Sequence, residues 1–501
     1  MSKNDKVKIG QIPTGVIGID EIMGGGLPEF SFNIIAGGPG CGKTTLAHQI
    51  VFANATTERP ALYFTLLGEP ALKMLRYQQQ FNFFRHDALN SKIQFVNLSQ
   101  MVLDRGLDMV LKQITEAVEH ANPSVIVIDS FRALLRGENN AGFEPGVRAF
   151  VERLALFLAT WQATTFLVGE YSEEDVRFNA VFTVADGIIW LYQAVERNSV
   201  VRKLQILKLR GRASIPGLHT FRIKDDGLQV FPRTLGPSGR NSSQGPRNRL
   251  STGTPELDKM MGGGPLEGDS ILVAGPSGTG KSVIASRFIQ DGLARGEPGV
   301  IVIFEEHPEE YCARAGDFGW DFIQPQKEGK LRVVYFRPMD LSVDESMLEI
   351  IGAVKATGAK RLVIDSITGF EMALAPAFRT DFRESLYRMI GGLTGLGVTI
   401  LSTVEIEDSF TTFPFSHYAI SFLTDDIIRM RYVEIGGQLR KVMTIIKMRG
   451  SNHSKDFREY IINDKGISII EPPQTDYDRL STGTPVRSLG QRIEVPPEKR
   501  E

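Results

Sequence analysis

This chain of 501 residues has few cysteines, no long apolar runs and almost equal numbers of acidic and basic residues. The only two cysteines, Cys41 and Cys312, offer no disulfide framework and favour a reducing compartment, so a cytoplasmic protein is expected. The polar first eight residues and the lack of any run of about 18 apolar residues predict neither secretion nor a membrane span. A net charge of −2 provides no overall positive field, which argues against nucleic acid or an anionic membrane as the main partner.

Glycine, by contrast, marks two phosphate-binding loops. Residues 37–44 and 275–282 both fit the pattern G-x-x-x-x-G-K-[ST], in which glycines let backbone N–H groups reach phosphate oxygens and the lysine reaches the β- and γ-phosphates. ATP is therefore the expected ligand of both loops. The expected nucleotide-binding residues are Gly38, Pro39, Gly40, Cys41, Gly42, Lys43, Thr44 and Thr45 in the first loop, and Pro276, Ser277, Gly278, Thr279, Gly280, Lys281, Ser282 and Val283 in the second.

The two loops belong to an internal repeat, because other landmarks recur at nearly the same offset. An apolar run that ends in Asp-Ser is found at residues 125–130 and again at 362–366, and Lys-x-Arg-Gly is found at 208–211 and 447–450. Apolar strands alternate with helical patterns in both copies. The predicted fold class is α/β, with two tandem RecA-like P-loop NTPase domains, each a mostly parallel sheet flanked by helices.

Changes in amino-acid composition along the chain indicate the domain boundaries. Residues 1–233 form the first predicted domain and residues 250–475 the second. Between them, residues 234–249 are rich in Gly, Pro and Ser without apolar periodicity, which is typical of a linker. Residues 476–501 are charged and Pro-containing and are expected to form a flexible tail.

Magnesium is the expected metal. The hydroxyls of Thr44 and Ser282 directly follow the loop lysines, where such a group ligates Mg²⁺. Asp129 and Asp365 end the second core strand of their copies and are expected to complete the metal shell. A strand-terminating cap is the alternative role for these two acids.

Catalysis also needs a carboxylate to polarise the attacking water or hydroxyl. In the second copy an apolar strand runs into Glu305-Glu306, the place where RecA-type ATPases carry their catalytic glutamate. In the first copy the corresponding strand is followed by Gly68-Glu69, so Glu69 falls within a residue or so of the pair and one carboxylate is missing. We expect strong catalysis in the second copy and weak or altered catalysis in the first, with a solvated loop pair as the alternative for Glu305-Glu306.

The Lys-x-Arg-Gly repeats supply two further pairs of candidate catalytic residues, Lys208 with Arg210 and Lys447 with Arg449. Two cations spaced two apart at a strand end lie on one face, which suits gripping a γ-phosphate. In ring ATPases such cations come from the neighbouring subunit. An exposed basic edge strand is the alternative.

The duplicated architecture, Glu305-Glu306 and the segments 365–369, 431–435 and 447–451 together resemble the KaiC family of circadian clock ATPases and autokinases. The likeness runs from about Thr14 to Arg487 and is closer in the second copy. It implies a two-tier homohexamer with ATP between subunits, slow ATP hydrolysis in the first tier and autophosphorylation in the second. It also implies KaiB-like or KaiA-like protein partners.

The resemblance further implies a phosphoacceptor. The family carries adjacent Ser and Thr acceptors before a Thr-Asp dipeptide; here Ser421 matches the serine, whereas Phe422 replaces the threonine. An ordered two-site cycle at those positions is therefore excluded, and single-site serine autokinase and autophosphatase activity is implied, with Ser416 as a second candidate. By the same resemblance Glu305 acts as general base on the serine of the adjacent subunit, supported by Glu306. An ordinary loop serine is the alternative for Ser421.

Two other functions compete with a timing or signalling autokinase. A DNA-dependent motor of the RecA or DnaB type needs basic loops, but residues 405–422 contain no Lys or Arg and residues 169–178 are acidic, so nucleic acid is not an expected partner. A nucleotide-gated signalling scaffold with little kinase activity remains open, because Phe422 and Gly68 depart from the family pattern.

Overall fold

Two nine-stranded sheets form the framework of the chain, one in each half of the sequence. They lie in two units, Met1–Arg233 and Thr234–Glu501, which we call lobe one and lobe two. The computed structural model describes residues 9–66, 71–130, 143–172, 181–196, 199–233, 247–337, 341–379, 382–406, 424–435 and 438–470. Within these ranges no helix is both long enough and apolar enough to cross a membrane.

Lobe one alternates strands and helices up to β8 and ends in a run of strands. Its strands are β1 Gln11–Ile12, β2 Leu27–Pro28, β3 Phe32–Gly37, β4 Ala61–Thr65, β5 Ile93–Asn97, β6 Val125–Asp129, β7 Thr164–Glu170, β8 Gly187–Glu196, β9 Ser199–Leu209, β10 His219–Lys224 and β11 Gly227–Phe231. Its helices are α1 Ile19–Ile22, α2 Lys43–Asn54, α3 Ala71–Gln78, α4 Ser99–Ala121, α5 Phe143–Thr160 and α7 Val181–Val184, with a 3₁₀ turn at His86–Ala88.

Lobe two repeats this alternation. Its strands are β12 Ser270–Gly275, β13 Gly299–Ile303, β14 Leu331–Tyr335, β15 Arg361–Asp365, β16 Thr399–Glu405, β17 Asp426–Ile435, β18 Gln438–Met448, β19 Arg458–Asn463 and β20 Gly466–Ile469. Its helices are α8 Pro255–Met260, α9 Lys281–Ala294, α10 Pro308–Asp317, α11 Ile323–Lys327, α12 Val343–Thr357, α13 Ile367–Ala373, α14 Pro376–Arg379 and α15 Phe382–Gly395.

The two sheets have the same strand order. It is β5-β4-β6-β7-β3-β8-β9-β10-β11 in lobe one and β14-β13-β15-β16-β12-β17-β18-β19-β20 in lobe two. The first six strands of each order are parallel and the last three are added antiparallel. The predicted fold class is confirmed, and the parallel order places the carboxyl ends of β3, β4, β6 and β7 at one edge.

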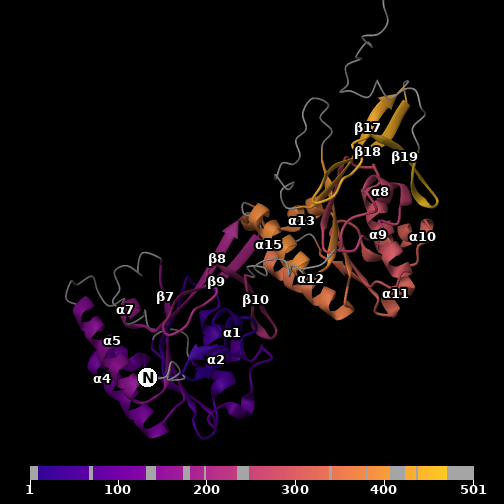
Figure 1. Cartoon of the computed structure of the whole chain (residues 1–501). Coiled ribbons are helices and arrows are strands. Elements are labelled where there is room, and N and C mark those ends of the chain that lie inside the picture. Colours follow the sequence, from indigo (N-terminus) through magenta and orange to yellow (C-terminus); the bar gives the residue numbers. More distant parts are fainter. Residues whose placement is uncertain are drawn as a thin grey trace, which may run out of the picture. The chain divides into compact units, whose positions relative to one another are not determined.

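Each sheet is buried on both faces, because alternate residues of a strand point to opposite sides. In β3, Ile35 packs with Leu46 and Ile50 of α2, whereas Ile34 packs with the helices α4 and α5. Lobe two has the same two apolar layers. Figure 1 shows helices on both faces of each sheet, with α1 and α2 opposite α4 and α5 in lobe one.

The last residues of the predicted linker pack against lobe two. Arg247 Nη1 lies 2.5 Å from Asp269 Oδ1, and Glu267 N donates to Asn248 O over 2.9 Å. The other predicted linker residues, 234–246, and the chain from residue 471 onward lie outside the described residues.

Candidate active site

Both phosphate loops connect a buried strand to the start of a helix, at the carboxyl edge of the parallel sheet. Residues 38–42 join β3 to α2, whose first turn carries Lys43, Thr44 and Thr45. Residues 276–280 join β12 to α9, whose first turn carries Lys281, Ser282 and Val283. A helix N-terminus preceded by free backbone N–H groups is a ready anion site, so both loops have the geometry expected for phosphate.

A left-handed glycine precedes each loop lysine. Gly42 has φ 100° and Gly280 has φ 97°, values that favour glycine. A Cβ at Gly42 would lie 2.8 Å from Ile223 Cδ1, and one at Gly280 would lie 2.7 Å from Ile462 Cδ1. Any other residue would therefore be strained by its φ angle and by its neighbour.

The loop lysines are held by main-chain oxygens at equivalent positions. Lys43 Nζ donates to Gly38 O over 2.6 Å, and Lys281 Nζ donates to Pro276 O over 2.9 Å. In lobe one Cys41 Sγ donates to the same Gly38 O over 2.9 Å. The two ammonium groups are thus already inside their loops, where a triphosphate would attract them.

The predicted metal ligands of lobe one converge. Thr44 Oγ1 lies 3.0 Å from Asp129 Oδ2, about the separation of two adjacent ligands around Mg²⁺. Tyr63 on the neighbouring strand donates its hydroxyl to the same Asp129 oxygen over 2.7 Å. Burial raises the pKa of Asp129, and the hydrogen bonds from Tyr63 and Thr44 oppose that shift. A carboxylate and a hydroxyl, completed by phosphates and water, are a donor set that fits Mg²⁺.

In lobe two the predicted metal ligand Asp365, which we call the metal acid of that lobe, is bonded from the strand on its other flank. Asp365 Oδ1 accepts a hydrogen bond of 2.5 Å from Thr403 Oγ1 on β16, and Ser282 occupies the first turn of α9. The residue at the position of Tyr63 is Ile301, since both lie two residues before the end of the strand beside the metal acid. The hydroxyl that a neighbouring strand donates to the aspartate therefore comes from β4 in lobe one and from β16 in lobe two.

Glu305 and Glu306 follow β13 but make different contacts. Glu305 Oε1 accepts from Ser366 Oγ over 3.0 Å, and this serine also caps α13 by accepting from Gly369 N. Burial lowers the pKa of Lys281, and the nearby carboxylates of Glu405, Asp365 and Glu305 oppose that shift. Glu305 therefore contacts Ser366 directly and adds to the negative charge near the loop lysine.

Glu306 points toward α10 instead. Its Oε2 lies 2.7 Å from Arg314 Nη2, and the Arg314 guanidinium also lies over the ring of Tyr311. Burial raises the pKa of Glu306, while the charge of Arg314 lowers it. The two adjacent glutamates thus have different partners, Arg314 for Glu306 and Ser366 for Glu305.

A third carboxylate, not predicted from the sequence, belongs to the same site. Glu405 ends β16 and pairs in register with Gly275, the first residue of the phosphate loop. Glu170 holds the same place in lobe one, where it pairs with Gly37. The available signal was the recurrence of a glutamate at the end of the strand after the Asp-Ser strand in both copies.

The strand register allows the two copies to be aligned after β4 and β13. Thr65 pairs with Asp129 just as Ile303 pairs with Asp365. Counting onward from these residues, Glu305 corresponds to Leu67 and Glu69 corresponds to His307, one residue from Glu306 and within the expected range. Residues 67–70 lie outside the described residues, so a catalytic role of Glu69 stays a prediction.

Comparison with known proteins identifies the family. The family model described as "ATPase: KaiC" matches residues 12–235 and again 250–474, which is most of the chain. The chain belongs to the KaiC family of ATPases. The predicted resemblance is confirmed, and ATP is the nucleotide that this family uses.

Curated KaiC proteins match nearly end to end. The circadian clock oscillator protein KaiC of Picosynechococcus sp. is 28% identical over 498 residues, covering 97% of this chain and 94% of that protein. KaiC 1 of Synechocystis sp. is 28% identical over 497 residues, with 97% and 94% covered. KaiC of Thermostichus vulcanus is 26% identical over 505 residues, with 99% and 95% covered.

The KaiC-type Lys-x-Arg-Gly cations lie at the other edge of the sheet from the phosphate loop of their own lobe. Lys208 pairs with Ile188 near the start of β8, and Lys447 pairs with Ile427 near the start of β17. β12 rises from that edge to the loop over six residues, about 20 Å. The sheet therefore does not bring these cations and the loop of the same lobe together.

Each of these cations has a partner within its own lobe. Lys208 Nζ donates to Thr183 O over 3.1 Å, and Lys447 Nζ donates to Thr424 O over 2.6 Å. The arginine of each repeat pairs with an aspartate that directly precedes β8 in lobe one or β17 in lobe two. Arg210 lies 3.0 Å from Asp186 Oδ1, and Arg449 lies 3.7 Å from Asp425 Oδ1.

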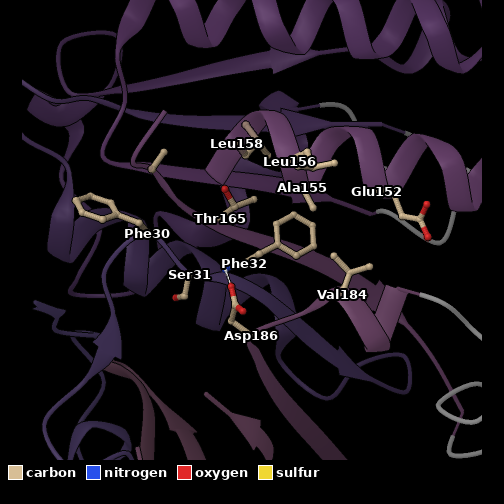
Figure 2. A pocket seen from close by; sticks show the side chains of 11 residues that line it. Phe30, Ser31, Phe32, Glu152, Ala155, Leu156, Leu158, Thr165, Val184 and Asp186 are labelled. Atoms are coloured by element: carbon tan, nitrogen blue, oxygen red, sulfur yellow. Dashed lines mark hydrogen bonds between the residues drawn. The ribbon is translucent and has the colours of Figure 1, made fainter. Parts of the chain in front are cut away.

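A cavity of about 360 Å³ in lobe one lies beside this cation edge and not at the phosphate loop. Figure 2 shows Phe32 in its middle, with Leu156 and Glu152 of α5 on one side and Val184 on another. Asp186 accepts from Phe32 N over 3.0 Å and also holds Arg210. The cavity is largely apolar, so it does not have the donors that a triphosphate needs.

The predicted phosphoacceptors, Ser421 and Ser416, lie outside the described residues. The described chain resumes at Thr424, whose carbonyl is held by Lys447. Among the residues in the described ranges, no group of three or more His, Cys, Asp or Glu is arranged to hold a metal without help from phosphate. The Mg²⁺ expectation thus rests on the hydroxyl and carboxylate of each loop.

Proposed function

We propose that this KaiC-family ATPase transfers the γ-phosphoryl group of ATP in lobe two, to water and to a serine of its own sequence, within a homohexameric ring. The observation that carries the proposal is the set of groups around Lys281. Glu305, Asp365 and Glu405 are near enough to Lys281 for their charges to raise its pKa against burial, and Ser366 donates to the Glu305 carboxylate over 3.0 Å. A nucleophile that enters between Glu305 and the loop would meet a base and a bound γ-phosphate together.

The chain's residues divide the work as follows. Lys281 leaves Pro276 O for the β- and γ-phosphate oxygens, while the loop N–H groups hold the rest of the triphosphate. Glu305 takes the proton of the attacking hydroxyl as the new O–P bond forms and the bond to the β,γ-bridging oxygen breaks. ADP leaves with that bond's electron pair. Ser282 and Asp365 would hold Mg²⁺, which would neutralise charge on the phosphates.

The position of the Lys-x-Arg-Gly cations is one argument for a ring. Lys447 and Arg449 lie at the amino edge of the parallel strands, so a nucleotide that they contact is not the one held by the loop of their own lobe, and we assign it to a neighbouring copy of the chain. Arginines supplied in this way raise phosphoryl-transfer rates by about 10³–10⁵. A closed ring gives every copy both a loop and a neighbour that completes it.

The relatives' names, circadian clock oscillator proteins, suggest timing as the setting, and KaiB-like or KaiA-like partners remain part of the proposal on that ground alone. Ser421 is the proposed acceptor, and Ser416 is the second candidate.

Labelling with γ-³²P-ATP and Mg²⁺ tests the autokinase. We expect covalent label in the wild-type chain and none in Glu305→Gln or Ser421→Ala. ATP hydrolysis should fall only in Glu305→Gln, because Ser421 is not needed when water is the acceptor. Ser416→Ala is the matched control. Absence of label in the wild type would remove the autokinase, and label that survives Ser421→Ala but not Ser416→Ala would move the acceptor to Ser416.

A further inference from the structure

The metal acid of lobe two has a glutamate on each side. Asp365 pairs with Ile303 of β13, and Glu305 follows two residues beyond that strand position. On the other flank, the register of β15 and β16 sets Thr403 opposite Asp365, and Glu405 lies two residues further on. Residues two apart point to the same side of a strand and are about 7 Å apart. Glu405 therefore lies on the same side of β16 as Thr403, which donates to Asp365, and Glu305 lies just beyond the end of β13, where it accepts a hydrogen bond from Ser366.

The first copy has a glutamate at only one of the two corresponding sequence positions. Counting two residues on from Thr65, the partner of Asp129, gives Leu67, which has no proton-accepting group and lies outside the described residues. Asp129 pairs with Val168 of β7, and Glu170 lies two residues further along that strand. Glu170 is thus the counterpart of Glu405.

The end of β7 is fixed to the phosphate loop. Glu170 pairs with Gly37, and Tyr171 N donates to Gly37 O over 3.4 Å. Tyr171 is buried with its ring edge against Phe182, at a centroid distance of 5.0 Å. Adjacent strands are about 4.8 Å apart, so the side chain of Glu170 is long enough to reach from β7 to the start of the phosphate loop at Gly37.

The remainder of the lobe-one site is intact. Lys43 is inside its loop, and Thr44 and Asp129 have the separation that Mg²⁺ needs.

We propose that Glu170 is the carboxylate that activates water for slow ATP hydrolysis in lobe one. In this step the water oxygen bonds to the γ-phosphorus and its proton moves to Glu170. The bond from the γ-phosphorus to the β,γ-bridging oxygen breaks, and its electron pair leaves with ADP. Glu170 then releases the proton to phosphate or bulk water, so ATP and water give ADP and inorganic phosphate. The proposal rests on ATP binding at both loops, as proposed above.

The test isolates lobe one in the full-length chain. Lys281→Ala removes the lysine of the second loop, and Glu305→Gln is a second background that leaves that loop unchanged. In both backgrounds we expect turnover slower than in the wild type. Adding Glu170→Gln should lower it about 100-fold or more, the usual contribution of a general base, without weakening ATP binding. Glu116→Gln, an exposed change on α4, should leave it unchanged.

Two results would overturn the proposal. One is turnover in either background that Glu170→Gln does not reduce, and the other is no turnover in both backgrounds. Failure of the proposed function would be a different result. It would be detected as Glu305→Gln protein that incorporates label and hydrolyses ATP as fast as the wild-type protein.

Discussion

Replacing Asp426 by asparagine is expected to stabilise lobe two at neutral pH. Asp426 begins β17, is fully buried, and has no hydrogen-bond partner for either carboxyl oxygen within the described part of the chain. Burial, together with the charges of Asp269 and Asp425, raises the pKa of Asp426 to about 7 against the opposing charges of Arg249 and Arg247. An ionised carboxylate at this position is therefore costly to fold.

The sign and size of the stability change caused by Asp426→Asn follow from the difference in the Asp426 pKa between the folded and unfolded chain. Below pH 4 the carboxyl is protonated in both states, so it makes no pH-dependent contribution. Between about pH 4 and 7 the unfolded chain has lost the proton that the folded chain still holds, and stability falls as pH rises. Three pKa units correspond to about 4 kcal/mol at pH 8, an order-of-magnitude figure. Asparagine does not titrate, so the advantage of the variant should grow from near zero to about this value.

Tryptophan fluorescence can isolate lobe two. The chain has three tryptophans, and Trp320 is the one that lies in this lobe, so Trp161→Phe with Trp190→Phe leaves a local reporter. Urea unfolding at pH 5, 6, 7 and 8 would give the free energy of unfolding with and without Asp426→Asn. Asp464→Asn in the exposed β19–β20 turn is the control. An advantage that stays constant with pH, or a loss of stability at pH 8, would refute the reasoning.

Three other predictions concern lobe one and the ring. Burial lowers the pKa of His48 to about 4, so lobe one should lose about 3 kcal/mol as the pH falls from 6.5 to 4; His48→Leu should remove this dependence in urea unfolding followed by Trp190, and an unchanged slope would contradict it. Tyr63→Phe should weaken Mg²⁺ binding in lobe one about 10- to 100-fold, because the tyrosine orients Asp129; ATP binding in EDTA should not change, and a Mg²⁺ titration of bound fluorescent ATP checks both. Arg449→Ala and Glu305→Gln, each slow alone, should regain ATP turnover when the two proteins are mixed and reassembled, because the arginine acts on the neighbour's nucleotide; mixtures no faster than their components would exclude action across the interface.

The repeat, the loops and the fold class could be predicted from sequence because local patterns specify them. Glycine at positions 42 and 280 is required by backbone geometry, and buried parallel strands appear as apolar runs. The Asp-Ser landmark likewise ends β6 and β15 as expected. None of these features depends on which strand lies beside which.

The contributions of neighbouring strands could not be predicted in this way. Glu170 and Glu405 belong to no motif, and only the pairing of their strands with the phosphate-loop strand brings them to the site. Tyr63 looks like an ordinary core aromatic until the sheet register sets it beside Asp129. The contact of Glu306 with Arg314 depends on the helix that follows, so two adjacent glutamates that look alike in the sequence have different partners.

The most direct measurement compares steady-state ATP turnover and bound nucleotide per chain in the wild-type protein and in Glu305→Gln. If lobe two carries most of the chemistry, turnover should fall at least about ten-fold, since a general base contributes about 10²–10⁴ to its own site, while nucleotide stays bound at both loops. Wild-type turnover in Glu305→Gln, with both loops still occupied, would contradict the assignment of catalysis to lobe two.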